Sequence, residues 1–235
     1  HRTSRRQRQM CIRDRMKTLL VGASSDIACH LYETYKNDYD FIRLSSNEDY
    51  SDISNFNLQD PNTYIDIENI SGIVYFPGTI VLKPFKQLGL DDFKNDYDIN
   101  VLGLLKILKH YQSNLVDGSS LVFISTVAAK LGMPFHSSIS MCKASLEALA
   151  ISLAAEWAPK VRVNCVAPSL VNTKLAKRFF RNDKQKEMMN DRHPLKKTGK
   201  AEDISHTIEL LLSNKSSWVS GQVFNIDGGM SSLKI

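Results

Sequence analysis

The sequence lacks the features that would assign it to a disulfide-rich, zinc-binding or membrane-spanning class. It has four cysteines, and no two of them form a C-x-x-C pair or a zinc-ligand spacing. No run of apolar residues approaches the roughly 18 that a membrane helix needs. We therefore expect a globular chain of the reducing cytoplasm, without a metal site and without a membrane partner.

An excess of positive charge is confined to the first 15 residues. The formal net charge is +5, and residues 1–15 contain six arginines and one aspartate. The rest of the chain carries equal numbers of basic and acidic side chains, so no nucleic-acid partner is expected. Because residues 1–15 begin with His and show no apolar periodicity, we interpret them as a non-native or disordered basic tail. The alternative is a functional basic arm.

Residues 16–235 are expected to form one domain, in which apolar runs alternate with helical patterns. This alternation is typical of a parallel sheet covered on both faces. The predicted strands are Lys17–Val21, Asp40–Leu44, Ile53–Phe56, Gly72–Tyr75, Ser120–Ser125, Arg162–Val166 and Gln222–Ile226. The predicted helices are Asp26–Lys36, Asp91–Gln112, Ile139–Ala158, Lys174–Asn190 and Glu202–Leu212. The expected fold is α/β, a single Rossmann-type doubly wound parallel sheet of about seven strands with helices on both faces.

A turn of small residues follows the first predicted strand. In VGASSDIA, which spans Val21–Ala28, a strand leads directly into a helix. This order places backbone N–H groups and a positive helix end where a pyrophosphate would bind. Asp26 and Ala28 stand where a three-glycine turn has its second and third glycines. The alternative is an ordinary strand–helix turn in which Asp26 is the N-cap.

Seven motifs in order make the chain resemble the short-chain dehydrogenase/reductase family, and most of all its 3-oxoacyl-thioester reductases. They are VGASSDIA, YFPGT, INVLG, ISTVAAKLG, SMCKASLEALA, RVNCVAPSLVNT and GQVFNIDGGMS. The resemblance implies a nicotinamide dinucleotide at the carboxyl ends of the strands. It also implies an NAD(P)H-dependent oxidoreductase that transfers a hydride to or from a carbonyl or hydroxyl group of a small molecule, with an acyl thioester as a candidate substrate. A homotetramer or dimer is the implied assembly.

The catalytic pattern departs from the family at its acid. In the family, a Tyr four residues before the Lys protonates the substrate oxygen, a Ser 13 residues before that Tyr hydrogen-bonds the same oxygen, and an Asn supports a water relay. The resemblance gives these Asn, Ser and Lys roles to Asn100, Thr126 and Lys143, but Ile139 stands in place of the Tyr. Loss of a positioned acid commonly lowers the rate by about 10²–10⁴.

His136 is a candidate replacement for the missing acid. It lies seven residues before Lys143, where the divergent enoyl-thioester reductases of the family place their Tyr, and imidazole titrates near neutral pH. The alternative is a loop histidine that faces solvent. Two functions therefore stay open: an enzyme with a rearranged acid, and a catalytically impaired member that binds dinucleotide and assembles with an active homologue.

The resemblance also assigns the residues that would contact the dinucleotide. The second strand ends without the Asp or Glu that would hold a ribose 2′-hydroxyl, whereas Arg43, Ser45 and Ser46 suit a 2′-phosphate, so NADP(H) is preferred over NAD(H). The segment Lys174–Pro194 is expected to cover the pocket. The expected contacts are Gly22, Ser24, Ser25, Asp26, Ile27, Arg43, Ser46, Asn57, Leu58, Phe76, Pro77, Gly78, Lys143, Pro168, Val171 and Thr173.

Overall fold

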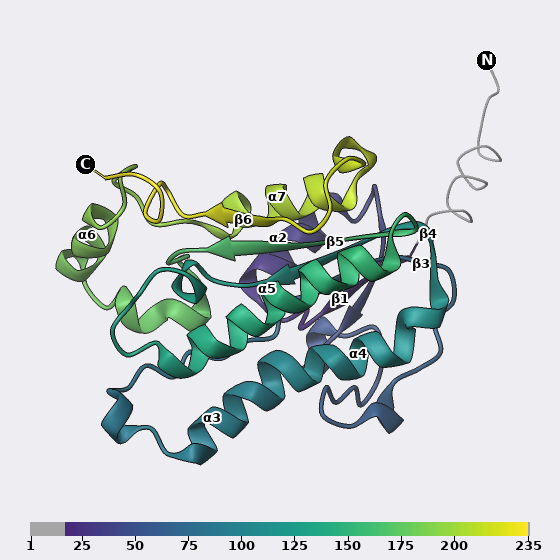
Figure 1. The fold of residues 1–235 in the computed structure, drawn as a ribbon, viewed down its shortest axis with the longest axis horizontal. Helices are drawn as coiled ribbons and strands as arrows, with labels where there is room; N and C mark the ends of the chain where they lie inside the picture. Colours follow the sequence, from purple (N-terminus) through teal and green to yellow (C-terminus); the bar gives the residue numbers. More distant parts are fainter. Residues whose placement is uncertain (1–16, 235) are drawn as a thin grey trace.

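The computed structural model describes residues 17–234, which form a parallel sheet between two layers of helices (Figure 1). The strands are β1 (Lys17–Val21), β2 (Asp40–Leu44), β3 (Ile70–Tyr75), β4 (Leu115–Ile124), β5 (Val161–Pro168) and β6 (Val223–Ile226). They lie in the order β2-β1-β3-β4-β5-β6, and each neighbouring pair is parallel. The predicted Rossmann-type fold is confirmed. The basic tail predicted at residues 1–15 lies outside the described residues.

Helices cover both faces of this sheet (Figure 1). They are α2 (Asp26–Tyr35), α3 (Leu90–Tyr97), α4 (Gly103–Tyr111), α5 (Ser137–Trp157), α6 (Asp183–Asp191) and α7 (Ala201–Leu212). Helices α4 and α5 pack on one face, and α2 and α7 pack on the other. The strand order reverses between β1 and β3, and in open α/β sheets ligands bind beside the carboxyl ends of the strands at such a point.

Alternating side chains along the strands divide the core into two layers. In β1, Leu19 and Val21 belong to the same core cluster as Leu146 of α5, whereas Leu20 belongs to the cluster of Ile204 in α7. Successive side chains of a strand point to opposite faces, so a strand buried on both faces must be apolar throughout. This is why the strands read as continuous apolar runs.

One predicted strand is wrong. Ile53–Phe56 lies in the connection between β2 and β3 and pairs with no strand of the described sheet. Asn55 has a φ of 58°, a left-handed conformation that interrupts an extended strand. Ile53 and Phe56 are nevertheless buried in the core that α4 and α5 cover. Their apolar character therefore reflects burial and not strand pairing, and the described sheet has six strands where about seven were expected.

Helix α5 has the length and apolar character of a membrane-spanning helix, yet it packs against the sheet. Cys142, Leu146, Ala150 and Ala154 are buried in one core cluster with residues of β1, β3, β4 and β5. Core helices of globular proteins share this composition because they bury a broad face. Packing on the sheet therefore accounts for much of the apolar character of α5, which also carries Lys143.

Candidate active site

A cavity of about 860 Å³ opens at the carboxyl ends of β1, β3, β4 and β5, within the usual size range of small-molecule sites. Every residue expected to contact a dinucleotide lines this cavity, with the exception of Arg43. Thr126, His136 and Lys143 line it as well. The structure therefore brings together residues that come from most of the length of the chain.

The β1–α2 turn presents backbone to the cavity. Gly22 has a φ of 78°, and a Cβ built on it would lie 2.8 Å from Cδ of Pro77, so a side chain here would meet both strain and a clash. Ser25 is the N-cap of α2, because its Oγ accepts a hydrogen bond from Ala28 N at 3.1 Å. The alternative that made Asp26 the N-cap is thus wrong. The N-terminal end of α2 lines the cavity, and a helix N-terminus favours an anion.

Asp26 ties this turn to the segment that follows β5. Its carboxylate accepts a hydrogen bond from Lys174 N and lies 3.6 Å from Lys174 Nζ. A carboxylate at this place repels an anionic ligand, and the lysine ammonium offsets that charge. Asp26 therefore holds Lys174 beside the same end of the cavity.

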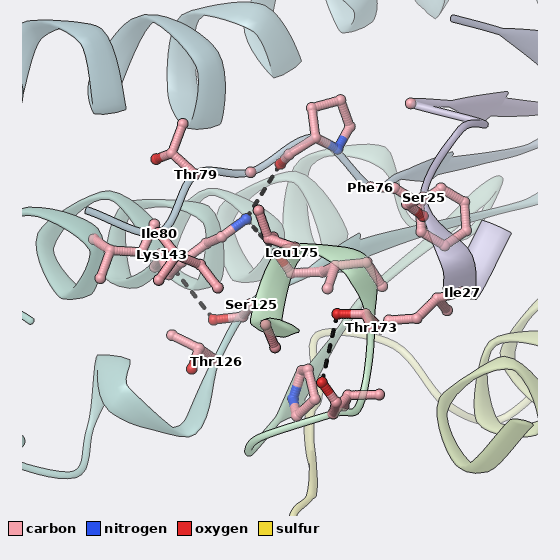
Figure 2. A pocket seen from close by; sticks show the side chains of 18 of the residues that line it. Ser25, Ile27, Phe76, Thr79, Ile80, Ser125, Thr126, Lys143, Thr173 and Leu175 are labelled. Carbon is pink, nitrogen blue, oxygen red and sulfur yellow. Dashed lines mark hydrogen bonds between the residues drawn. The ribbon is translucent and has the colours of Figure 1, made fainter. Parts of the chain in front are cut away.

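Lys143 lies buried at the cavity wall. Its Nζ donates hydrogen bonds to the carbonyl oxygens of Ile124 at 2.8 Å and Pro77 at 3.3 Å (Figure 2). Burial lowers the pKa of this ammonium to about 8, because the charged form loses its hydration. An ammonium has three N–H donors, so two carbonyls leave one donor for a ligand hydroxyl.

Asn100 is oriented by a buried polar network. Its Nδ2 donates to Thr79 Oγ1 at 3.1 Å and to Asp96 O at 2.8 Å, while its Oδ1 has no hydrogen-bond partner among the described residues. A Cβ built on Gly78 would lie 3.4 Å from this Oδ1 and 3.2 Å from Lys143 Nζ. A buried acceptor needs a donor, here a water or a ligand hydroxyl. Lys143 therefore fits a ligand hydroxyl in the cavity, whereas Asn100 lies next to it and outside the cavity lining.

A widened helical turn places Asn100 at this point. Asp98–Leu102 forms a π-helix between α3 and α4, and the Tyr75 hydroxyl donates to the Ile99 carbonyl within it. A Cβ built on Gly103 would lie 2.5 Å from that hydroxyl, so glycine permits the contact. Such π-bulges are frequent at functional sites.

The acid position is apolar in the cavity as it is in the sequence. Ile139, in the first turn of α5, is 5% exposed and lines the cavity together with Thr126. Thr126 Oγ1 accepts a hydrogen bond from Ala128 N at 3.3 Å, which leaves its hydroxyl proton for a substrate. Nδ1 of His136 lies 2.6 Å from Pro134 O, so Nδ1 is the donor and Nε2 is the nitrogen that a substrate would meet.

Arg43 lies outside the cavity lining. Its Nη2 lies 2.6 Å and its Nε lies 3.1 Å from Oδ1 of Asp52, and its guanidinium stacks over the ring of Tyr32 at 4.6 Å. This pairing uses two of the five N–H donors of the guanidinium and directs that part of the side chain toward Asp52. The structure thus brings Ser46, but not Arg43, to the place expected for a 2′-phosphate.

Three polar residues near the cavity were missed by the sequence reasoning. Buried Asp96 accepts hydrogen bonds from the hydroxyls of Thr79 and Ser138. Ser169 and His193 line the cavity and lie 2.9 Å apart, measured from Oγ to Nε2. Ser169 replaces the glycine of P-G-x-V-x-T, which is a visible signal. Nothing in the sequence pairs it with His193, which lies 24 positions later.

These features define a Rossmann-type α/β domain whose cavity is lined by a buried lysine, with a buried asparagine next to that lysine. The chain belongs to the short-chain dehydrogenase/reductase family: residues 65–231 match the family described as enoyl-(acyl carrier protein) reductase.

Known proteins that resemble the chain agree with this assignment. The peroxisomal 2,4-dienoyl-CoA reductase of Saccharomyces cerevisiae is 32% identical over 148 residues, which are 62% of this chain and 51% of that protein. The short-chain glucose/ribitol dehydrogenase of Brucella melitensis has a TM-score of 0.84 at 22% identity, covering 91% of this chain and 96% of its own. A 4-hydroxyisoleucine dehydrogenase complexed with NADH has a TM-score of 0.80 at 24% identity, covering 93% and 100%. The chain spans about half the length of the first of these relatives.

Proposed function

We propose that this chain is an NAD(P)(H)-dependent oxidoreductase that transfers a hydride between the dinucleotide and a carbonyl or hydroxyl group of a small molecule. The observation that carries the proposal is that Lys143 Nζ and Asn100 Oδ1 both lie beside Gly78, and that this Oδ1 has no hydrogen-bond partner among the described residues. A bound dinucleotide would supply the hydride. The side chains of this protein would bind it, exclude water and place a proton.

Each end of the cavity suits one part of a dinucleotide. The turn at Gly22 and the N-terminus of α2 suit the pyrophosphate. Lys143 suits the ribose next to the nicotinamide. The Thr173 hydroxyl, which donates to Val171 O at 3.4 Å (Figure 2), is positioned to turn to a carboxamide. Family membership supports these roles, and the distances above are compatible with them.

NADP(H) remains the preferred cofactor in this proposal. Ser45 and Ser46 still support this preference, whereas Arg43 lies outside the cavity lining. Ser45 and Ser46 line the cavity at the end of β2, and Asp26 is the one acidic residue among the described lining residues. A 2′-phosphate would therefore meet hydroxyls and no carboxylate at β2. Calorimetric titration with NADPH and NADH measures this preference, and tighter binding of NADH would reverse it.

An apolar carbonyl compound, such as an acyl thioester, is the substrate class that the lining favours. Leu175, Phe179 and Met189, from the segment expected to cover the pocket, line the cavity. The yeast relative is named as a reductase of a dienoyl-CoA, which supports the same class.

A second candidate function is a dinucleotide-binding subunit without chemistry of its own. Apolar Ile139 at the acid position favours it. Met141 and Ile151 on α5 are about half exposed, and they suit an interface with another subunit. We propose a homotetramer or dimer for the enzyme, and assembly with an active homologue for the second candidate.

We also propose a cytoplasmic location. The thiols of Cys142 and Cys165 are buried and free, which fits a reducing cytoplasm.

The test is NADPH binding followed by NADPH oxidation across a panel of ketones, 3-oxoacyl thioesters and enoyl thioesters. Binding with turnover of any panel member supports the oxidoreductase. Binding without turnover of any of them supports the second candidate. Absence of binding at millimolar NADPH contradicts both.

A further inference from the structure

A serine–histidine pair faces the cavity and has no part in the proposed cofactor site. Ser169 follows β5, and His193 follows α6. Ser169 Oγ lies 2.9 Å from His193 Nε2 and 3.0 Å from Met230 Sδ. His193 is 3% exposed, yet it lines the same cavity as Lys143 and Ile139. A buried imidazole beside a cavity hydroxyl is an arrangement that can move a proton.

The hydrogen bonds of His193 fix which nitrogen does the chemistry. Nδ1 lies 2.8 Å from the Met189 carbonyl oxygen, and a carbonyl only accepts, so Nδ1 carries a proton in every state. Nε2 of neutral His193 then accepts a hydrogen bond from the Ser169 hydroxyl. Protonated His193 instead donates from Nε2 to Ser169 Oγ, and the serine proton turns to Met230 Sδ or to a ligand. A thioether is a weak acceptor, so a substrate oxygen would displace it.

Ser169 is located at the end of the cavity where the hydride would be transferred. It lies next to Pro168, a position expected to contact the dinucleotide, and four residues before Thr173, whose hydroxyl suits the carboxamide of the nicotinamide. All three residues line the cavity. A carbonyl substrate that lies against the nicotinamide must also lie near this stretch of backbone.

We propose that Ser169 and His193 bind the substrate oxygen and supply its proton, in place of the tyrosine that Ile139 replaces. This inference rests on the proposed oxidoreductase function and names the acid of that same site. It assigns the acid to a different histidine from His136, whose Nε2 has no serine relay in the structure.

The proposed proton path balances. A bound reduced dinucleotide would supply the hydride for a C–H bond at the carbonyl carbon, and the C=O π pair would move onto oxygen. The Ser169 hydroxyl gives its proton to that oxygen, and Nε2–H of protonated His193 restores the serine proton. The imidazolium becomes neutral imidazole and takes a proton back from solvent. The products are the alcohol and the oxidised dinucleotide.

The charges around His193 come from two sides. Asp227 precedes Gly228, whose backbone packs on the imidazole: a Cβ built on Gly228 would lie 3.5 Å from His193 Cβ. The Asp227 carboxylate accepts hydrogen bonds from Gly229 N and Ser231 N, both at 2.9 Å. Arg192, next in the chain, also lines the cavity.

Two substitutions test the relay without removing its scaffold. His193→Asn places an amide N–H near the Nδ1 position, so the bond to Met189 O can persist while Nε2 is lost. Ser169→Ala removes the hydroxyl and leaves His193 in place. His206→Gln, at an exposed position on α7, is the matched control. Carbonyl-dependent NADPH oxidation should fall about 100-fold or more in each of the first two variants, with NADPH affinity and melting temperature close to wild type.

A second measurement needs no turnover. Histidine labelled with ¹³C at Cε1 gives one NMR signal per imidazole, and the signal missing from His193→Asn is that of His193. Acetoacetyl-coenzyme A, a simple 3-oxoacyl thioester, forms a non-reacting complex with the protein and oxidised NADP. In that complex the His193 signal should shift in wild type and stay in place in Ser169→Ala.

The outcomes separate this inference from the proposed function. Turnover lost in both variants, with the ligand-induced shift, supports the relay. Wild-type turnover that persists in His193→Asn, or that is lost only in His136→Gln, overturns the relay and leaves the oxidoreductase standing. A wild-type protein that binds NADPH but reduces no carbonyl overturns both.

Discussion

The two ends of the cavity follow the family pattern to very different degrees. At the cofactor end, Gly22, Gly78, Asn100 and Lys143 are retained, and the first two and Lys143 line the cavity. At the substrate end, Ile139 replaces a proton donor, and Ser169 stands in place of a glycine. At the cofactor end, a ligand would approach the protein backbone closely, so the residues there can change little without a clash. The substrate end depends on which side chains carry protons, and these have been rearranged.

The largest expected effect is at the cofactor end, from Lys143→Met. The methionine fills a similar volume but cannot donate to a ribose hydroxyl, so NADPH affinity and turnover should each fall about 100-fold or more. The fold should survive, because the substitution removes a buried charge that is costly to desolvate. Calorimetric titration and thermal unfolding measure the two effects. Lys215→Met, at an exposed position, is the control, and equal loss of binding there would contradict the assignment.

At the substrate end, Ile139→Tyr restores the acid of the family. The phenol would lie four residues before Lys143, whose ammonium favours the phenolate. In a Ser169→Ala background, which lacks the proposed relay, carbonyl reduction should therefore rise by about 10²-fold. Ile139→Phe adds the ring without the hydroxyl and serves as the control. Initial rates of NADPH oxidation by the tyrosine and phenylalanine variants measure the difference. A tyrosine variant that binds NADPH and stays as slow as the phenylalanine variant shows that the missing acid is not the main defect.

Gly22→Ala tests whether backbone geometry sets the cofactor end. Alanine at a φ of 78°, with its Cβ 2.8 Å from Pro77 Cδ, should cost about 1–3 kcal/mol of unfolding free energy. It should also weaken NADPH binding, because the turn moves away from the phosphates. Urea unfolding measures the first effect. Gly132→Ala, where a Cβ meets no heavy atom within 4 Å, should change neither quantity; an equal cost at both glycines would contradict the account.

The smallest expected effect is a dependence of NADPH affinity on pH. Burial lowers the pKa of Lys143 to about 8, so the free protein loses this charge as pH rises through 8. Affinity should therefore be constant at lower pH and weaken several-fold above pH 8. Titrations from pH 6.5 to 9.5 measure it. An affinity that rises with pH would mean that Lys143 does not hold the ligand as an ammonium.

The contrast between the cofactor end and the substrate end also explains which parts of the fold and the site the sequence could predict. Strand, turn and helix order predicted the sheet, because strands buried on both faces are continuous apolar runs. The one wrong strand, Ile53–Phe56, was apolar because it is buried in a loop. Motif spacing predicted residues that the structure brings to one cavity, since the family pattern records backbone positions there. Arg43 lies outside the lining of that cavity, and its pairing with Asp52 depends on where the short connection after β2 returns.

The side-chain contacts at the substrate end could not be predicted from the sequence, for a different reason. His193 meets Ser169 only because the segment after α6 packs beside the end of β5. Asp96 likewise meets Ser138 across 42 positions of sequence. No local pattern reports such contacts. The candidate acid at His136 came from spacing alone and remains a prediction, since the structure places it at the cavity without a relay partner.

A crystal structure of the protein soaked with NADP tests the central claim most directly. The account predicts a dinucleotide in the cavity, its pyrophosphate at the turn of Gly22, its nicotinamide ribose on Lys143 Nζ, and Ser169 as the hydroxyl beside the nicotinamide. A cavity that stays empty at millimolar NADP, or a dinucleotide bound away from Lys143, would contradict it.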